Sequence, residues 1–170
     1  MRTVIIDDEE NARQTISRLL LQYMDDVEIV GEAGDVKTGV QVVKKNRPDV
    51  LLLDIDLPDG TGFDLLEQLK DYDFQLIFIT AFEEYAIQAF KFSALDYLLK
   101  PFDPEDVRAA FSRARDLKEK EEIQLKLNAF LSNIENISRE VKKIVLRTSE
   151  SLHLLNVPDV DQCRADGNYT

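Results

Sequence analysis

The chain has 170 residues, 44% of them hydrophobic, and a formal net charge of −12 at pH 7. This hydrophobic share excludes a wholly disordered chain, and the single cysteine, Cys163, excludes an intramolecular disulfide framework. No apolar run approaches the ~20 residues that cross a bilayer, and the acidic N-terminal segment differs from a signal peptide, so we expect a soluble, cytoplasmic protein without membrane contact.

Short apolar strands alternate with helices over the first hundred residues. The pattern predicts strands at 3–6, 27–33, 50–54, 76–80 and 95–98, and helices at 11–24, 36–47, 62–72, 83–90 and from 103 onward. The aliphatic run at 50–53 is typical of a strand buried on both faces of a sheet. The predicted fold class is therefore α/β, with a five-stranded, doubly wound parallel sheet.

A long helix follows, because nothing breaks a helical pattern between Pro104 and about Lys142. Its second half carries apolar residues at spacings of four, three, four, three and four, the repeat of a helix–helix seam: Ile123, Leu127, Phe130, Ile134, Ile137 and Val141. Two interpretations stay open. The helix either dimerises or docks on another helix, or it is a single solvated helix whose apolar stripe rests on its own domain.

The last 27 residues change to a period of two, which predicts two short strands on either side of a turn at 148–151. So short a segment cannot close a core by itself, and we infer that the chain ends inside a second domain. The expected organisation is an α/β domain at 1–120, a helical linker able to form a coiled coil at 121–142, and the start of a β-rich domain at 143–170.

Polar side chains stand at the ends of four predicted strands. Asp7 and Asp8 follow the first strand and Asp54 the third, while Thr80 ends the fourth and Lys100 follows the fifth. Because the first and third strands are neighbours in a doubly wound sheet, their carboxylates should converge. Like charges at this distance need a cation, and Mg2+ prefers carboxylate oxygens. The sequence therefore predicts a magnesium site, with Lys100 as a further positive charge.

Such a site suits phosphoryl transfer. A carboxylate beside Mg2+ can attack a phosphoryl group and become an acyl phosphate, which makes Asp54 the candidate nucleophile. Thr80 could donate its hydroxyl to an oxygen of the transferred group. Purely structural roles stay open beside these: a helix cap for Asp8, a turn for Asp54, a strand residue for Thr80, an exposed lysine for Lys100 and aromatic core for Tyr97.

Residues 1–120 resemble the receiver domain of two-component response regulators. The resemblance rests on Asp7-Asp8, the segment LLLDIDLPDGTG around Asp54, Thr80-Ala81, and Tyr97 followed by Lys100-Pro101, in the order and spacing of that family. It implies that Asp54 accepts a phosphoryl group from a sensor histidine kinase, and that the chain is a signalling protein rather than an enzyme, apart from weak self-dephosphorylation.

The resemblance also implies roles around Asp54. Mg2+ would be held by Asp8, Asp54 and the backbone carbonyl of Asp56, with Asp7 supporting. Thr80 and Tyr97 would be a switch pair, Lys100 would bind the phosphoryl group, and the peptide bond before Pro101 would be cis. We further expect that Phe82, two residues after Thr80, hinders the water that hydrolyses the acyl phosphate.

The tail resembles the opening of a LytTR-type DNA-binding domain, from Lys143-Ile144-Val145-Leu146 to Ala165-Asp166-Gly167-Asn168-Tyr169-Thr170. This implies a transcription regulator. Phosphorylation at Asp54 is expected to change the face made by the fourth helix, fifth strand and fifth helix and to favour a homodimer. The family's main DNA-contacting segments would lie beyond Thr170, so we predict no DNA-binding residue here. Residues 1–103, with 21 acidic and 10 basic side chains, are a poor polyanion binder in any case.

Two other functions are compatible with parts of the sequence. A receiver can act through protein contacts alone, without DNA. The pair Asp54 and Asp56 also resembles the Asp-x-Asp motif of haloacid-dehalogenase-like phosphatases, in which the second carboxylate is an acid/base. Those enzymes place the pair on the first strand, whereas here it follows the third and leaves Asp7 and Asp8 unexplained.

Overall fold

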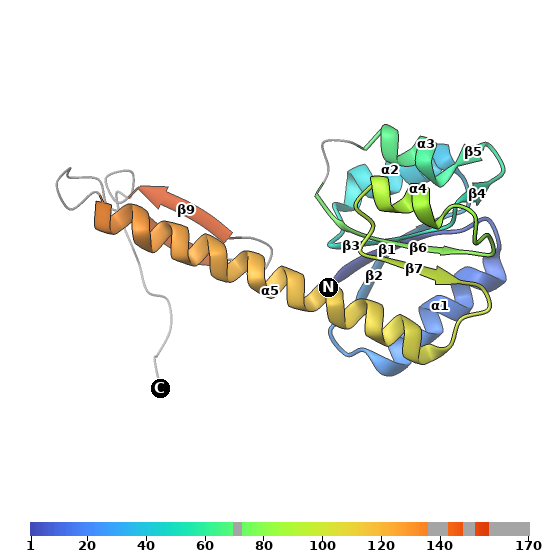
Figure 1. Ribbon diagram of the computed structural model, residues 1–170, viewed down its shortest axis with the longest axis horizontal. Coiled ribbons are helices and arrows are strands. Elements are labelled where there is room, and N and C mark those ends of the chain that lie inside the picture. The colour runs from blue at the N-terminus through green and yellow to red at the C-terminus, as the bar shows by residue number, and fades with distance from the viewer. Residues whose placement is uncertain (70–72, 136–142, 148–151, 157–170) are drawn as a thin grey trace. The chain divides into compact units, whose positions relative to one another are not determined.

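The structure, a computed structural model, describes residues 1–69, 73–135, 143–147 and 152–156 (Figure 1). The chain divides into two compact units, Met1–Arg115 and Asp116–Thr170. Among the described residues, no helix is both long and apolar enough to span a membrane.

Five parallel strands form the sheet of the first unit, in the order β2-β1-β3-β6-β7 (Figure 1). Their bounds are β1 (Arg2–Ile6), β2 (Glu28–Ala33), β3 (Val50–Leu53), β6 (Gln75–Thr80) and β7 (Asp96–Leu99). After β2 the chain returns past β1 to form β3, so the order reverses between β1 and β3. The prediction of a five-stranded, doubly wound parallel sheet is confirmed. Ligands of such sheets bind at this reversal, beyond the carboxyl ends of the strands.

Helices cover both faces of the sheet, with α2, α3 and α4 on one side and α1 and α5 on the other (Figure 1). Their bounds are α1 (Glu10–Tyr23), α2 (Val36–Asn46), α3 (Gly62–Glu67), α4 (Ala86–Lys91) and α5 (Pro104–Glu135). Alternate residues of a strand point to opposite faces, and two buried clusters result. Leu51 and Leu53 of β3 face the helices α2 and α3, whereas Leu52 faces Ile16 and Phe111 of α1 and α5.

The segment after β3 differs from the sequence prediction. Two strands of two residues each, β4 (Asp56–Leu57) and β5 (Gly60–Thr61), form a small antiparallel hairpin where a loop was predicted. Strands this short carry no alternation that a pattern could reveal. The helix predicted at 62–72 is α3 and ends at Glu67, with a capping box between Thr61 and Asp64 at its start. The helix predicted at 83–90 begins three residues later, at Ala86.

In the second unit, the two predicted strands are confirmed as the antiparallel pair β8 (Lys143–Arg147) and β9 (Leu152–Asn156). The predicted turn at 148–151 and the predicted helical residues 136–142 lie outside the described part of the chain. Of the predicted seam, Ile123 and Leu127 have exposed fractions of 63% and 45%. Phe130 and Ile134 lie in α5, but nothing is described of their side chains, and Ile137 and Val141 lie outside the described residues.

Candidate phosphoacceptor site

The site begins with two aspartates at the ends of neighbouring strands. Ile6 and Leu53 are paired in the β1–β3 ladder. Asp7 and Asp54 directly follow them at the ends of the two strands. The amide of Asp54 donates to the carbonyl of Ile6 at 2.8 Å, and the amide of Asp7 donates to the carbonyl of Ala33 at 3.1 Å. The ladder therefore holds both backbones and brings the two side chains to the same edge of the sheet.

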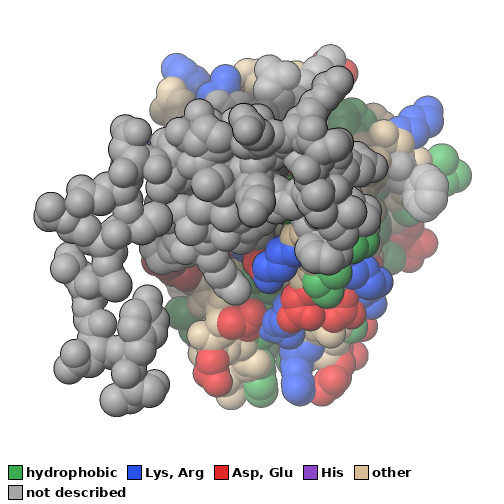
Figure 2. All heavy atoms as spheres, turned by 90° about the vertical axis from the view of Figure 1, so that its left-hand side faces the viewer, with side chains coloured by type: hydrophobic (Ala, Val, Ile, Leu, Met, Phe, Trp, Pro, Cys, Tyr) green, Lys and Arg blue, Asp and Glu red, His purple; other side chains and the backbone are tan. Residues whose placement is uncertain are grey.

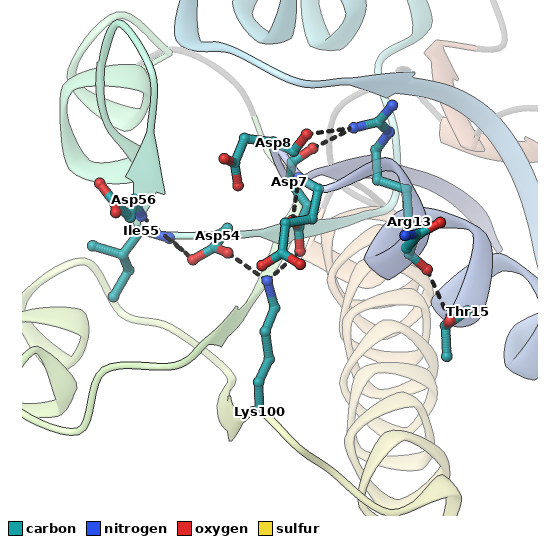
Figure 3. Close-up of polar contacts among 10 residues, drawn as sticks. Asp7, Asp8, Arg13, Thr15, Asp54, Ile55, Asp56 and Lys100 are labelled. Atoms are coloured by element: carbon teal, nitrogen blue, oxygen red, sulfur yellow. Dashed lines mark hydrogen bonds and ion pairs between the residues drawn. The ribbon is translucent and has the colours of Figure 1, made fainter.

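Lys100 lies between these carboxylates (Figure 3). Its Nζ is 2.6 Å from an oxygen of Asp7 and 2.6 Å from an oxygen of Asp54. The lysine follows β7, its amide donates to the carbonyl of Thr80 at 2.8 Å, and the Lys100–Pro101 peptide bond is cis, as predicted. Buried charges need such pairing, because an isolated carboxylate in a core loses its hydration without compensation.

Three carboxylates form an acidic cluster around this point. Asp7, Asp8 and Asp54 each offer an oxygen, and these oxygens lie within 4.8 Å of one another. Asp7 and Asp54 are buried, and Asp8 is exposed. A set of hard oxygen donors with net negative charge fits Mg2+. The residues present therefore suit the ion that the sequence implied.

The two oxygens of Asp54 have different surroundings (Figure 3). Oδ1 accepts from the amide of Ile55 at 2.6 Å and from the amide of Asp56 at 3.3 Å, while Oδ2 accepts from Lys100. The side chain of Asp56 is exposed. The carboxylate of Asp54 is thus fixed in orientation by its own loop on one side and by a cation on the other.

Burial and charge act in opposite directions on the pKa values of the ion pair. Burial raises the pKa of Asp7 above its ordinary value, although Lys100 opposes this. Burial would lower the pKa of Lys100, but its hydrogen bonds to Asp54 and Asp7 and their charges outweigh that effect and raise it. The ammonium of Lys100 is therefore charged at neutral pH, whereas burial makes the ionised form of Asp7 less favourable than it is in water.

Thr80 is the last residue of β6, and Tyr97 lies on the neighbouring strand β7. Thr80 is fully buried, and its Oγ1 has no hydrogen-bond partner among the described residues. The hydroxyl of Tyr97 donates to the backbone carbonyl of Phe82, and its ring lies 6.1 Å from that of Phe78. Tyr97 is half-buried in an aromatic neighbourhood, and burial raises the pKa of its hydroxyl.

Two polar contacts of the segments that follow β1 and β3 were missed from the sequence. Nη1 of Arg13 donates to the backbone carbonyls of Asp7 and Asp8 (Figure 3). The carboxylate of Asp59 accepts from the first amides of α2, those of Val36 and Lys37. A signal for Arg13 did exist: a cation near the start of a helix opposes the helix dipole and therefore needs a local reason.

Comparisons with known proteins agree with this geometry. Residues 3–112 match the response regulator receiver domain family. The chain is 34% identical over 162 residues to the sensory transduction protein LytT of Bacillus anthracis, covering 94% of this chain and 64% of LytT. It is 40% identical over 126 residues to the transcriptional regulatory protein BtsR of Escherichia coli strain K12, covering 74% of this chain and 52% of BtsR. The chain thus spans between half and two thirds of these relatives.

Solved structures give the same result. The response regulatory domain of protein mrkE from Klebsiella pneumoniae is similar with a TM-score of 0.65 and 30% identity, over 71% of this chain and 99% of that one. The REC domain of AraT, a response regulator from Geobacillus stearothermophilus, gives 0.64 and 29% over 71% and 97%. The receiver resemblance noted in the sequence is therefore confirmed, and the chain belongs to the response regulator receiver domain family.

Proposed function

We propose that Asp54 accepts a phosphoryl group from the phosphohistidine of a sensor histidine kinase. One observation carries the proposal: the Asp54 carboxylate is buried at the reversal of the strand order, 2.6 Å from the ammonium of Lys100 and within an acidic cluster suited to Mg2+. A carboxylate so placed is held in a fixed orientation for attack on a phosphoryl group.

The reaction needs little more than positioning. An oxygen of Asp54 forms a bond to phosphorus, the phosphorus–nitrogen bond breaks, and the leaving imidazole keeps the electron pair and takes a proton. Lys100 offsets negative charge on the phosphoryl oxygens and then pairs with the product. Asp8, Asp54 and the backbone carbonyl of Asp56 would hold Mg2+, with Asp7 supporting. When bound, Mg2+ supplies further neutralisation of the phosphoryl oxygens.

Thr80 and Tyr97 are proposed as the switch. The hydroxyl of Thr80, which has no hydrogen-bond partner in the described part of the chain, would donate to a phosphoryl oxygen on Asp54 and draw the end of β6 toward it. Tyr97 would then release the carbonyl of Phe82 and turn inward. The phosphoryl group shifts the population because it binds this arrangement more tightly than the other. The face formed by α4, β7 and α5 would change with it and favour a homodimer.

The output proposed for the whole protein is transcription control through a LytTR-type DNA-binding domain, which begins in residues 143–170. The similarity to LytT extends over 162 residues and so includes much of this tail, and BtsR is named a transcriptional regulatory protein. A receiver that acts only through protein contacts is the alternative. Binding of the full-length protein to promoter DNA, and its dependence on Asp54, would separate the two.

The test of phosphorylation uses acetyl phosphate and intact-protein mass spectrometry. With Mg2+ present, the wild-type chain should gain the mass of one phosphoryl group, and Asp54→Asn should gain none. A gain that persists in Asp54→Asn would contradict the proposal. Repeated turnover of small phosphomonoesters would instead favour a phosphatase of the haloacid-dehalogenase type. Because a receiver meets the cytoplasmic part of its kinase, a cytoplasmic location belongs to the same proposal.

A further inference from the structure

Arg13 occupies an unusual place beside the acidic cluster. It projects from α1 over the segment that joins β1 to the helix, and Nη1 donates to two successive backbone carbonyls, at 2.6 Å to Asp7 and 3.3 Å to Asp8 (Figure 3). Its side chain is 18% exposed. The guanidinium thus binds the backbone of the acidic residues rather than their carboxylates.

The Nε edge of the guanidinium faces Glu32 in an ion pair, and Nε has no hydrogen-bond partner among the described residues. Nε of Arg13 lies 3.4 Å from a carboxylate oxygen of Glu32 on β2, and the second oxygen of Glu32 accepts from the hydroxyl of Ser17 at 3.0 Å. Arg13 therefore connects β2 and α1 to the β1–α1 segment. Because the group is planar, fixing one edge also fixes the direction of its remaining N–H groups.

The two carbonyls that Arg13 binds lie on either side of the Cα atom of Asp8. The carbonyl of Asp7 belongs to the peptide plane before the Cα of Asp8, and the carbonyl of Asp8 belongs to the plane after it. Peptide units are planar, so holding both planes fixes φ and ψ of Asp8 and with them the direction of its Cα–Cβ bond. Asp8 is the exposed member of the cluster, so packing does not fix the orientation of its side chain.

We infer that Arg13 is a positioning residue for the cation site: it holds the Asp7–Asp8 backbone so that the Asp8 carboxylate faces Asp54. This inference rests on the proposed function, since it supposes that the acidic cluster takes Mg2+. The order that Arg13 imposes before the ion arrives lowers the entropy lost on binding.

Charge and positioning predict opposite effects of removing Arg13 on the affinity for Mg2+. Arg13 is a cation near a cation site, so its removal should tighten Mg2+ binding if only Coulomb repulsion mattered. If positioning dominates, its removal weakens binding. Loss of a residue that orients metal ligands typically lowers affinity about ten-fold or more.

The experiment measures Mg2+ affinity by isothermal titration calorimetry for wild type, Arg13→Met and Arg18→Met. Arg18 is an exposed residue of the same helix, so its replacement is matched in charge and chemistry. We expect the dissociation constant to rise about ten-fold in Arg13→Met and to stay within about two-fold in Arg18→Met. Arg13→Lys keeps the charge but loses the planar fork, and should also bind more weakly than wild type.

A second readout needs no metal. The amide of Glu9 donates to the side chain of Asp7 at 3.0 Å, so its hydrogen exchange reports opening of the β1–α1 segment. Without Mg2+, exchange at Glu9 should be faster in Arg13→Met, while amides of β3 keep the wild-type rate. If Arg13→Met shows unchanged exchange at Glu9 and unchanged or tighter Mg2+ binding, the inference about Arg13 is overturned, while the proposed function is not affected. Absence of Mg2+ binding in the wild-type protein would overturn the proposed function together with it.

Discussion

The ammonium of Lys100 forms ion pairs with both Asp7 and Asp54. Its side chain is 17% exposed, and those of the two aspartates are 2% and 7% exposed. Removing one partner of a buried ion pair is more damaging than its net contribution suggests, because the other charge stays buried.

Replacing Lys100 by methionine should therefore destabilise the metal-free protein. We expect a loss of about 2–4 kcal/mol in the free energy of unfolding at pH 7, measured by urea denaturation in the presence of a chelator. The control is Lys91→Met, which removes an exposed lysine of α4 and should change stability by less than about 0.5 kcal/mol. Equal effects of the two substitutions would contradict this account of Lys100.

Phe82 is the second single residue for which a role at the site is predicted. It is half-buried, its carbonyl accepts from Tyr97, and its ring lies 6.0 Å from that of Tyr85. If this ring hinders the attacking water, Phe82→Ala should speed loss of the phosphoryl group from Asp54, followed by mass spectrometry after removal of acetyl phosphate. An unchanged rate would remove Phe82 from the mechanism.

At the scale of elements, the contact between α5 and the turn after α1 depends on pH. Arg115 donates to both carboxylate oxygens of Asp26, at 3.0 and 2.7 Å, and this holds the pKa of Asp26 below its ordinary value. A carboxyl group with a lowered folded pKa stabilises the fold above its unfolded pKa of 3.8, and the contribution is lost as pH falls through the folded pKa.

Asp26→Asn should accordingly be less stable than wild type at pH 7, and the difference should shrink below pH ~4. Both side chains are partly exposed, so the difference at neutral pH should be no more than about 1 kcal/mol. Urea denaturation at the two pH values measures it. A difference that stays constant or grows on acidification would show that the charge of Asp26 is not its source.

The turn between α4 and β7 contains a strained residue. Ser93 has φ of 54°, in the left-handed region that residues with a Cβ atom avoid. Ser93→Gly should relieve this strain and raise the free energy of unfolding by about 0.5–1 kcal/mol. The same replacement in a helix, Ser112→Gly in α5, should lower it by about 0.5–1 kcal/mol. Two effects of equal sign would contradict the role assigned to φ.

At the scale of the whole molecule, binding of Mg2+ to the acidic cluster would stabilise the folded chain. A ligand that binds only the folded state stabilises it, by about 2.7 kcal/mol at a concentration 100 times its dissociation constant. Mg2+ should therefore raise the melting temperature of the wild-type chain more than NaCl of equal ionic strength does. The rise should be much smaller in Asp8→Asn, and an equal rise in both would place the ion elsewhere.

The charge of the molecule is acidic overall but mixed locally. Acidic and basic side chains stand next to one another on the described surface visible in Figure 2. Residues 1–103, with 21 acidic and 10 basic side chains, offer little attraction to a polyanion. This supports assigning DNA binding to the C-terminal domain in the proposal above.

The sequence by itself determined the sheet and the location of the site. Apolar runs of strand length alternate with helical patterns, and this periodicity indicates which face of each element is buried. In a doubly wound sheet β1 and β3 are neighbours, and this brings Asp7 and Asp54 together. Both inferences use information that is local in the chain, or a rule of chain topology that holds across many folds.

Only the tertiary structure decided the contacts between residues distant in sequence. Examples are the hydrogen bonds of Asp59 to the start of α2 and the ion pair of Arg13 with Glu32. The tertiary structure also decided that the buried hydroxyl of Thr80 meets no hydrogen-bond partner among the residues described. Each depends on the packing of a helix or turn against the sheet to within a few tenths of an ångström. Periodicity specifies which face of an element is buried, but it does not specify which atoms meet there.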